Sequence, residues 1–198
     1  MLEKLVELDR ELFVYLNNLQ SPFWDPIMVF ASDKYVWVPF YLGLISYVIW
    51  KYKRKSIPML LLAVLTIALA DSITSGIFKP YFARLRPCHD PTLSETINLV
   101  AGCGGKFGFM SSHAANSFGF AVFFNLVLSD RYAIFKFILV AWAVIVSYSR
   151  IYLGVHFPGD IIGGAIVGSF AAYLCALGYD IVIRKYSWFG VSDNLTRN

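Results

Sequence analysis

The segment from Ser149 to Asp160 combines three residue types that can do chemistry together. Arg150 is followed by His156 and, after three further residues, by Asp160, and the segment lies between two long apolar runs. Ionisable groups near hydrocarbon cost free energy, so they are functional candidates by default. An aspartate can orient an imidazole, and a guanidinium can hold a phosphate through two hydrogen bonds. The alternative is a short polar turn between two membrane helices, and this segment alone does not decide between the two.

Two further segments carry groups suited to the same chemistry. Six residues separate Lys79 from Arg86, and Ser111 and His113 stand at the start of an apolar run. Cations beside a helix N-terminus form an anion site, because free backbone N–H groups and the positive end of the helix dipole face the ligand. Two histidines can divide phosphoryl transfer, one as nucleophile and one as general acid. The sequence has no carboxylate cluster for magnesium and no Cys/His set with zinc spacing, so we expect a mechanism without metal or other cofactor.

Taken together, the three segments resemble the type 2 phosphatidic acid phosphatase family, whose pattern is K-x6-R-P, P-S-G-H and S-R-x5-H-x3-D. The first and third parts are complete in this chain, whereas Met110 and Ser112 replace the usual proline and glycine of the second. The order and separation of the parts also match, and the resemblance covers about residues 59 to 183. The family is related to the vanadium haloperoxidases.

The resemblance implies a role for each matched residue. His156 would be the nucleophile that forms a phosphohistidine, with Asp160 holding its other ring nitrogen. His113 would protonate the leaving oxygen. The phosphate oxygens would be held by cations and by hydrogen-bond donors at the helix start, namely Lys79, Arg86, Arg150, Ser111 and Ser112. Because Ser112 stands where glycine is usual, we expect altered substrate fit before lost activity. Arg84 could also touch the substrate, but we interpret it as a solvated loop cation.

The composition indicates which elements must position these residues. The 198-residue chain is 58% hydrophobic and 15% charged, whereas a soluble domain carries roughly a quarter charged residues. Since a membrane span needs about 20 apolar residues, we expect an all-α integral membrane bundle of five to six transmembrane helices. The apolar runs behind this expectation are 36–50, 59–78, 114–128, 134–148 and 161–183. Residues 12–31 are interpreted as a broken first span or a re-entrant helix.

We expect residues 1–198 to form a single membrane domain. Charged and apolar residues are interspersed over about residues 1–20, which predicts an amphipathic helix lying at the membrane interface. Residues 80–110 form the one long polar connection and are predicted to be an outer active-site loop. The net charge of +4 is not read as a nucleic-acid signal, because no basic stripe alternates with exposed aromatic residues.

Basic residues beside the apolar runs predict the orientation. Clusters at 51–55, 131–136 and 184–185 fall on one side if the spans alternate, and that side is cytoplasmic by the positive-inside rule. The three motifs then meet on the opposite side, facing the periplasm or exterior of a bacterial inner membrane. Cys88 and Cys103 share this outer side, where an oxidising compartment permits a disulfide, although two free thiols are the alternative. Cys175 is read as a packing residue.

The leading functional hypothesis is a membrane lipid phosphatase that releases phosphate from a lipid phosphate or pyrophosphate. Undecaprenyl diphosphate and lipid A are favoured as substrates, with phosphatidylglycerol phosphate and phosphatidic acid as alternatives. A different class is a non-enzymatic lipid binder or transporter on the same fold, but such a protein needs no nucleophile with an orienting acid. A soluble vanadate-dependent haloperoxidase fits the apolar composition poorly. The oligomeric state is left open.

Overall fold

The computed structural model describes residues 2–185, so residue 1 and residues 186–198 of the predicted single domain lie outside the described part. Within that part the regular structure is helical, and the only β-type pairing is an isolated bridge between Leu85 and Phe107. In chain order the α-helices are α1 (Leu2–Asn17), α2 (Asp25–Ser32), α3 (Val38–Tyr52), α4 (Ser56–Asp71), α5 (Lys79–Phe82), α6 (Ser112–Val127), α7 (Ala133–Tyr152) and α8 (Pro158–Lys185).

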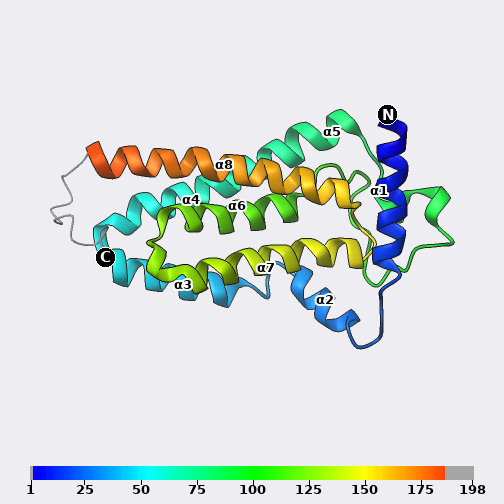
Figure 1. Ribbon diagram of the computed structural model, residues 1–198, viewed down its shortest axis with the longest axis horizontal. Helices are drawn as coiled ribbons and strands as arrows, with labels where there is room; N and C mark the ends of the chain where they lie inside the picture. The colour runs from blue at the N-terminus through cyan, green and yellow to red at the C-terminus, as the bar shows by residue number, and fades with distance from the viewer. Residues whose placement is uncertain (1, 186–198) are drawn as a thin grey trace.

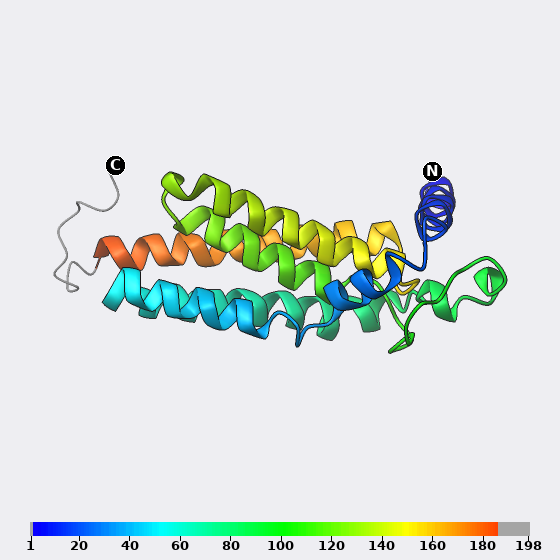
Figure 2. The ribbon, with the colours of Figure 1, turned by 90° about the horizontal axis from the view of Figure 1, so that it is seen from below.

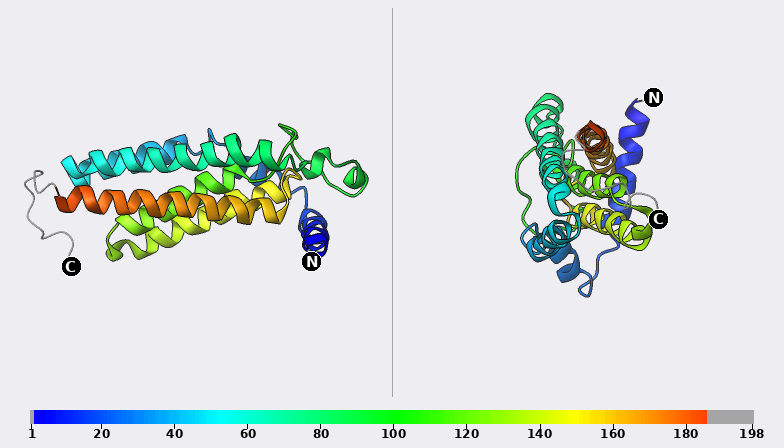
Figure 3. Two further views of the ribbon diagram at one scale, coloured as in Figure 1. Left: turned by 90° about the horizontal axis from the view of Figure 1, so that it is seen from above. Right: turned by 90° about the vertical axis from the view of Figure 1, so that its left-hand side faces the viewer.

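The long helices lie side by side along the longest axis, and α1 crosses one end of this bundle (Figures 1, 2 and 3). Helix α6 packs against α4, α7 and α8. Close packing of α6 on α8 requires glycine, because a Cβ at Gly164 would overlap the Ser111 carbonyl and one at Gly168 would overlap that of Ala115. The small residues therefore bring the first turns of α6 and α8 together inside the bundle.

Three helical stretches are long and apolar enough to cross a membrane, namely Val38–Phe82, Asp130–Tyr152 and Pro158–Arg184. The first contains the turn at Lys53–Lys55, where the chain reverses direction, so it comprises α3 and the helix that continues from α4 into α5 (Figure 1). Large apolar side chains such as Ile134 and Ile166 are exposed on the outside of the bundle, as in a lipid-facing surface. The expectation of an all-α membrane protein is confirmed, and the count of five to six spans stays a prediction.

Residues 12–31 do not form one helix. Helix α1 ends at Asn17, and α2 has 8 residues, which at 1.5 Å per residue is about 12 Å and too short to cross about 30 Å of hydrocarbon. Asn17 is fully buried, donates to the Tyr152 carbonyl over 2.9 Å and accepts from the Asn98 N–H over 2.8 Å. The polar residue that interrupts the apolar pattern is thus used to fix α1 across the end of the bundle.

The predicted 80–110 loop begins inside a helix. A π-helical segment, Ser72–Phe78, joins α4 to α5, and Ala83 ends α5 in the left-handed conformation with φ of 45°. Two 3-10 turns follow, at Pro87–His89 and Pro91–Leu93. π-Helical turns re-aim the side chains that follow them and occur often at functional sites. Here the segment directly precedes Lys79.

Candidate active site

The three motif segments meet at the end of the bundle that α1 crosses (Figure 1). The Ser111 N–H donates to the Asp160 carbonyl over 3.0 Å, which ties the start of α6 to the start of α8. The Lys79 ammonium donates to the Ser112 hydroxyl over 2.8 Å, which ties α5 to the same helix start. Residues that lie far apart in the sequence thus form one site.

His156 and Asp160 form a buried pair at the turn between α7 and α8. His156 Nδ1 lies 3.3 Å from Asp160 Oδ2, which also accepts the Phe157 N–H over 3.0 Å. Their side chains are 1% and 0% exposed, respectively. Gly154, with φ of 77°, allows the tight turn after α7, and α8 begins with a proline, so that Asp160 falls in its first turn. Because Nδ1 faces the carboxylate, Nε2 is the ring nitrogen left for other chemistry.

Burial lowers the pKa of His156 well below its ordinary value, because the imidazolium form loses hydration. The nearby cations of Arg86 and Arg150 lower it further. His156 is therefore neutral near pH 7. A neutral imidazole that donates Nδ1–H to a carboxylate keeps its lone pair on Nε2.

Arg86 is held by backbone carbonyls of its own loop. Its Nε donates to the Phe107 carbonyl over 3.3 Å, and one terminal nitrogen donates to the Cys103 carbonyl over 3.2 Å. The backbone N–H of Arg86 donates to the Lys106 carbonyl over 3.1 Å. Burial lowers its pKa from the ordinary value, although an arginine keeps its charge. These contacts fix the guanidinium while leaving its charge unneutralised.

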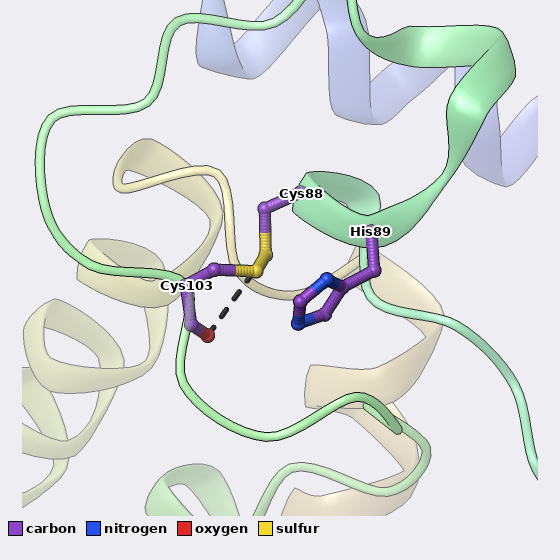
Figure 4. A group of neighbouring side chains, drawn as sticks. All are labelled: Cys88, His89 and Cys103. Carbon is purple, nitrogen blue, oxygen red and sulfur yellow. Dashed lines mark hydrogen bonds between the residues drawn. A yellow bond between two sulfur atoms is a disulfide. The ribbon is translucent and has the colours of Figure 1, made fainter.

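The sulfur atoms of Cys88 and Cys103 are joined in a disulfide, with 5.9 Å between the Cα atoms. Figure 4 shows the His89 ring beside this bond. Ligand atoms of the three residues lie within 4.8 Å of one another, but sulfurs bonded to each other are not thiolate ligands for a metal. Instead, Nε2 of the His89 ring lies 3.2 Å from the carbonyl oxygen of Gly104. The disulfide thus closes the loop whose Cys103 carbonyl holds Arg86.

Ser112, which replaces the usual glycine, bonds to Lys79 through its side chain. Its hydroxyl also lies 2.8 Å from Ser75 Oγ and 3.2 Å from Thr74 Oγ1, both in the π-helical segment. Ser111 is fully buried, and its side chain caps α6 by accepting the Ala114 N–H over 3.4 Å. The two serines therefore do different things: Ser111 starts the helix and Ser112 positions the ammonium.

Arg150 is the third cation of the site. One of its terminal nitrogens donates to the Ser32 hydroxyl of α2, and its Nε is buried without a hydrogen-bond partner among the described residues. Within residues 2–185, Lys79, Arg86 and Arg150 bond to hydroxyls and carbonyls and form no ion pair. Three cations without a carboxylate partner and one unpaired donor are what a phosphate group requires.

The interpretation of Arg84 as a solvated loop cation is wrong. Its side chain is 25% exposed and donates to Asp160 Oδ1 over 2.9 Å and to Asp9 Oδ2 over 2.7 Å. Its guanidinium carbon lies 4.1 Å from the centre of the Phe157 ring. Unlike the other three cations of the site, Arg84 is neutralised by two carboxylates. No feature of the local sequence indicates this pairing.

Sequence reasoning also missed Gly108. A Cβ at this position would lie 3.0 Å from Asp160 Oδ2, 3.1 Å from Arg86 Cγ and 3.5 Å from His156 Nδ1. The absence of a side chain lets the loop backbone close over the histidine–aspartate pair. The signal available in the sequence was that Gly108 lies near the end of the stretch from Cys103 to Met110. A glycine there can mark a point where the backbone passes close to other groups.

A cavity of about 650 Å³ reaches from the start of α6 into the bundle. His113 and Ser112 line one end, and the lining follows α6 as far as Phe124, which at 1.5 Å per residue is about 18 Å. Tyr41 of α3, Trp142 of α7 and Trp37, which directly precedes α3, also line it. An apolar channel therefore leads to the histidine of α6.

Comparison with known proteins shows similarity over most of the chain. The model of the PAP2 superfamily matches residues 59–183. A lipid A 4′-phosphatase of Bacteroides thetaiotaomicron is 37% identical over 177 residues, covering 88% of this chain and 78% of the relative. A lipid A 4′-phosphatase of Porphyromonas gingivalis is 33% identical, covering 96% and 80%. The crystal structure of Aquifex aeolicus LpxE is 30% identical with a TM-score of 0.64, covering 87% of this chain and 96% of that one.

Proposed function

This chain belongs to the PAP2 superfamily, and from that premise we propose that it removes a phosphate group from a membrane lipid through a phosphohistidine on His156. The observation that carries the proposal is the buried pair of His156 and Asp160 beside three cations that have no carboxylate partner. A nucleophile oriented by an acid and a preorganised set of positive charges are what phosphoryl transfer needs.

In the first step the Nε2 lone pair of His156 attacks phosphorus, a P–N bond forms, and the P–O bond to the lipid breaks. Burial and the nearby cation of Arg150 lower the pKa of His113 to about 3 in the free site, so His113 takes up its proton together with the negatively charged phosphate group and then gives that proton to the leaving lipid oxygen. In the second step His113 takes a proton from water, the water oxygen attacks phosphorus, and the P–N bond breaks to release phosphate. Lys79, Arg86 and Arg150 stabilise the charge on the equatorial oxygens, where fixed donors contribute most.

We propose a phosphomonoester on an acylated sugar lipid of the lipid A type as the substrate. Two relatives named lipid A 4′-phosphatase, at 37% and 33% identity, support this choice. The apolar cavity that begins at His113 supports it as well, because hydrocarbon next to the phosphate site can lie there. Undecaprenyl diphosphate, phosphatidylglycerol phosphate and phosphatidic acid are the competing substrates.

We also propose that the site faces away from the cytoplasm, in the bacterial inner membrane. The basic connections at 51–55 and 131–136 lie at the end of the bundle opposite to the site, as does the C-terminal end of α8 (Figure 1). By the positive-inside rule that end is cytoplasmic. A disulfide on the opposite side supports an oxidising compartment.

The test is phosphate release by purified wild-type protein and by the His156→Ala variant, with lipid A, undecaprenyl diphosphate, phosphatidylglycerol phosphate and phosphatidic acid. We expect the wild type to release phosphate fastest from lipid A, and the variant to release none while still binding the lipid. If wild type and variant are equally inactive on all four lipids, the protein is a binder or transporter instead. Faster release from another lipid would overturn the substrate assignment alone.

A further inference from the structure

We propose that Asp9 and Arg84 are positioning residues for the reaction, through which the interfacial helix α1 holds the His156–Asp160 pair in its reactive geometry. This inference rests on the proposed function, because it needs His156 as the reacting group. Neither residue touches the histidine, so both would act through Asp160. Asp9 lies outside all three motifs.

The connection is a continuous chain of charged hydrogen bonds. Asp160 Oδ2 lies 3.3 Å from His156 Nδ1, while its Oδ1 accepts from Arg84 over 2.9 Å. The other terminal nitrogen of Arg84 donates to Asp9 Oδ2 over 2.7 Å. A buried carboxylate needs a partner for each oxygen, and Arg84 supplies one of them. The direction of the Asp160 carboxylate is therefore set from both sides.

Asp9 holds the turn itself as well as Arg84. Its Oδ1 accepts the Gly159 N–H over 2.7 Å, one residue before Asp160. A Cβ at Gly159 would lie 2.9 Å from Asp9 Oδ2, so the residue there must be small for the carboxylate to approach. The Asp9 carboxylate of α1 thus accepts hydrogen bonds both from the start of α8 and from Arg84, which orients Asp160.

Further contacts hold α1 in the position from which Asp9 can bond to Arg84 and to the start of α8. Phe13 packs edge-on against Phe157, with 5.2 Å between the ring centres, and is fully buried. Asn17 donates to the Tyr152 carbonyl at the other side of the α7–α8 turn. Helix α1 therefore contacts the turn along its length, and Asp9 sits at a fixed point above it. An ion pair on a solvated surface would not be held in place by so many additional contacts.

The experiment compares kcat and KM for phosphate release by Asp9→Asn, Arg84→Lys and the double variant, each purified in full length. Asparagine keeps the shape of Asp9 without its charge, and lysine keeps the charge of Arg84 but cannot bridge two carboxylates. Glu11→Gln is the matched control, because Glu11 is an exposed carboxylate on the same helix. We expect each single change to lower kcat by roughly 10- to 100-fold, since small misplacements of a reacting group cost that much.

Because both residues act through one network, the double variant should lose no more than the worse single variant, with KM unchanged within about twofold. The melting temperature in detergent should match that of Glu11→Gln. Three outcomes would each overturn the inference. The first is a double variant whose loss in kcat is the product of the two single losses. The second is a kcat for Asp9→Asn equal to that of the control, and the third is a lower kcat accompanied by a raised KM and a lowered melting temperature. An inactive wild type would instead refute the proposed function.

Discussion

Lys79 Nζ lies 2.8 Å from Ser112 Oγ, so the residue that departs from the family pattern is the residue that holds a motif lysine. A glycine at this position cannot make the bond. The hydroxyl also lies 2.8 Å from Ser75, which places the lysine in a small network of serines. We therefore interpret Ser112 as an anchor for the ammonium group, which refines the expectation of altered substrate fit.

Replacing Ser112 with alanine should lower phosphate release. A hydrogen bond to a charged group contributes about 1.5–3 kcal/mol, so losing it from Lys79, which we propose to stabilise the transition state, should lower kcat about tenfold or more. Steady-state kinetics on Ser112→Ala and Ser112→Gly measure this. Both variants should be slowed, because neither has the hydroxyl. Full activity in Ser112→Gly would contradict the anchoring role.

Adding one methyl group at Gly108 should be as damaging as losing a charged hydrogen bond. A Cβ there would lie 3.0 Å from Asp160 Oδ2 and 3.1 Å from Arg86 Cγ, so one of them must move. We expect Gly108→Ala to lower kcat/KM at least about tenfold. Gly105→Ala is the control in the same loop, because a Cβ there meets nothing within 4 Å. Equal activities of the two variants would mean that the loop gives way freely.

Reducing the Cys88–Cys103 disulfide should weaken phosphate binding. The Cys103 carbonyl accepts from Arg86 over 3.2 Å, and the disulfide keeps that carbonyl in place. We expect KM to rise several-fold in reducing buffer and in the Cys88→Ser/Cys103→Ser variant. Reductant should have no further effect on that variant. If the reductant affects the variant as much as the wild type, the group on which the reductant acts is not this disulfide.

The acidic limb of the pH profile should lie below the ordinary histidine range. In the proposed mechanism His156 attacks as the neutral imidazole, and burial together with the nearby cations lowers its pKa well below 6.5. As pH falls through that lowered pKa, the nucleophile becomes protonated and kcat/KM is lost. A pH profile of kcat/KM on two phosphate monoesters of different phosphate pKa separates His156 from the substrate. An acidic limb centred above pH 6.5 for both substrates would contradict a neutral, buried His156.

The amino-acid sequence by itself determined the membrane class, the main helices and the three motif segments. Each of these depends on spacing within one short stretch: apolar runs long enough for a helix, or a histidine four residues before Asp160. Such local patterns need no knowledge of the rest of the chain. Even the break in residues 12–31 was visible, because polar residues interrupt an apolar run there.

Only the tertiary structure decided what Arg84, Asp9 and Gly108 do. Asp9 and Arg84 are 75 residues apart, and their meeting depends on how α1 crosses the end of the bundle. Gly108 is used because a loop backbone approaches two buried side chains from elsewhere in the chain. An ion pair between distant elements produces no periodic pattern in the sequence of either segment. The free energy of such a pair depends on its burial, and that burial exists only after the helices pack.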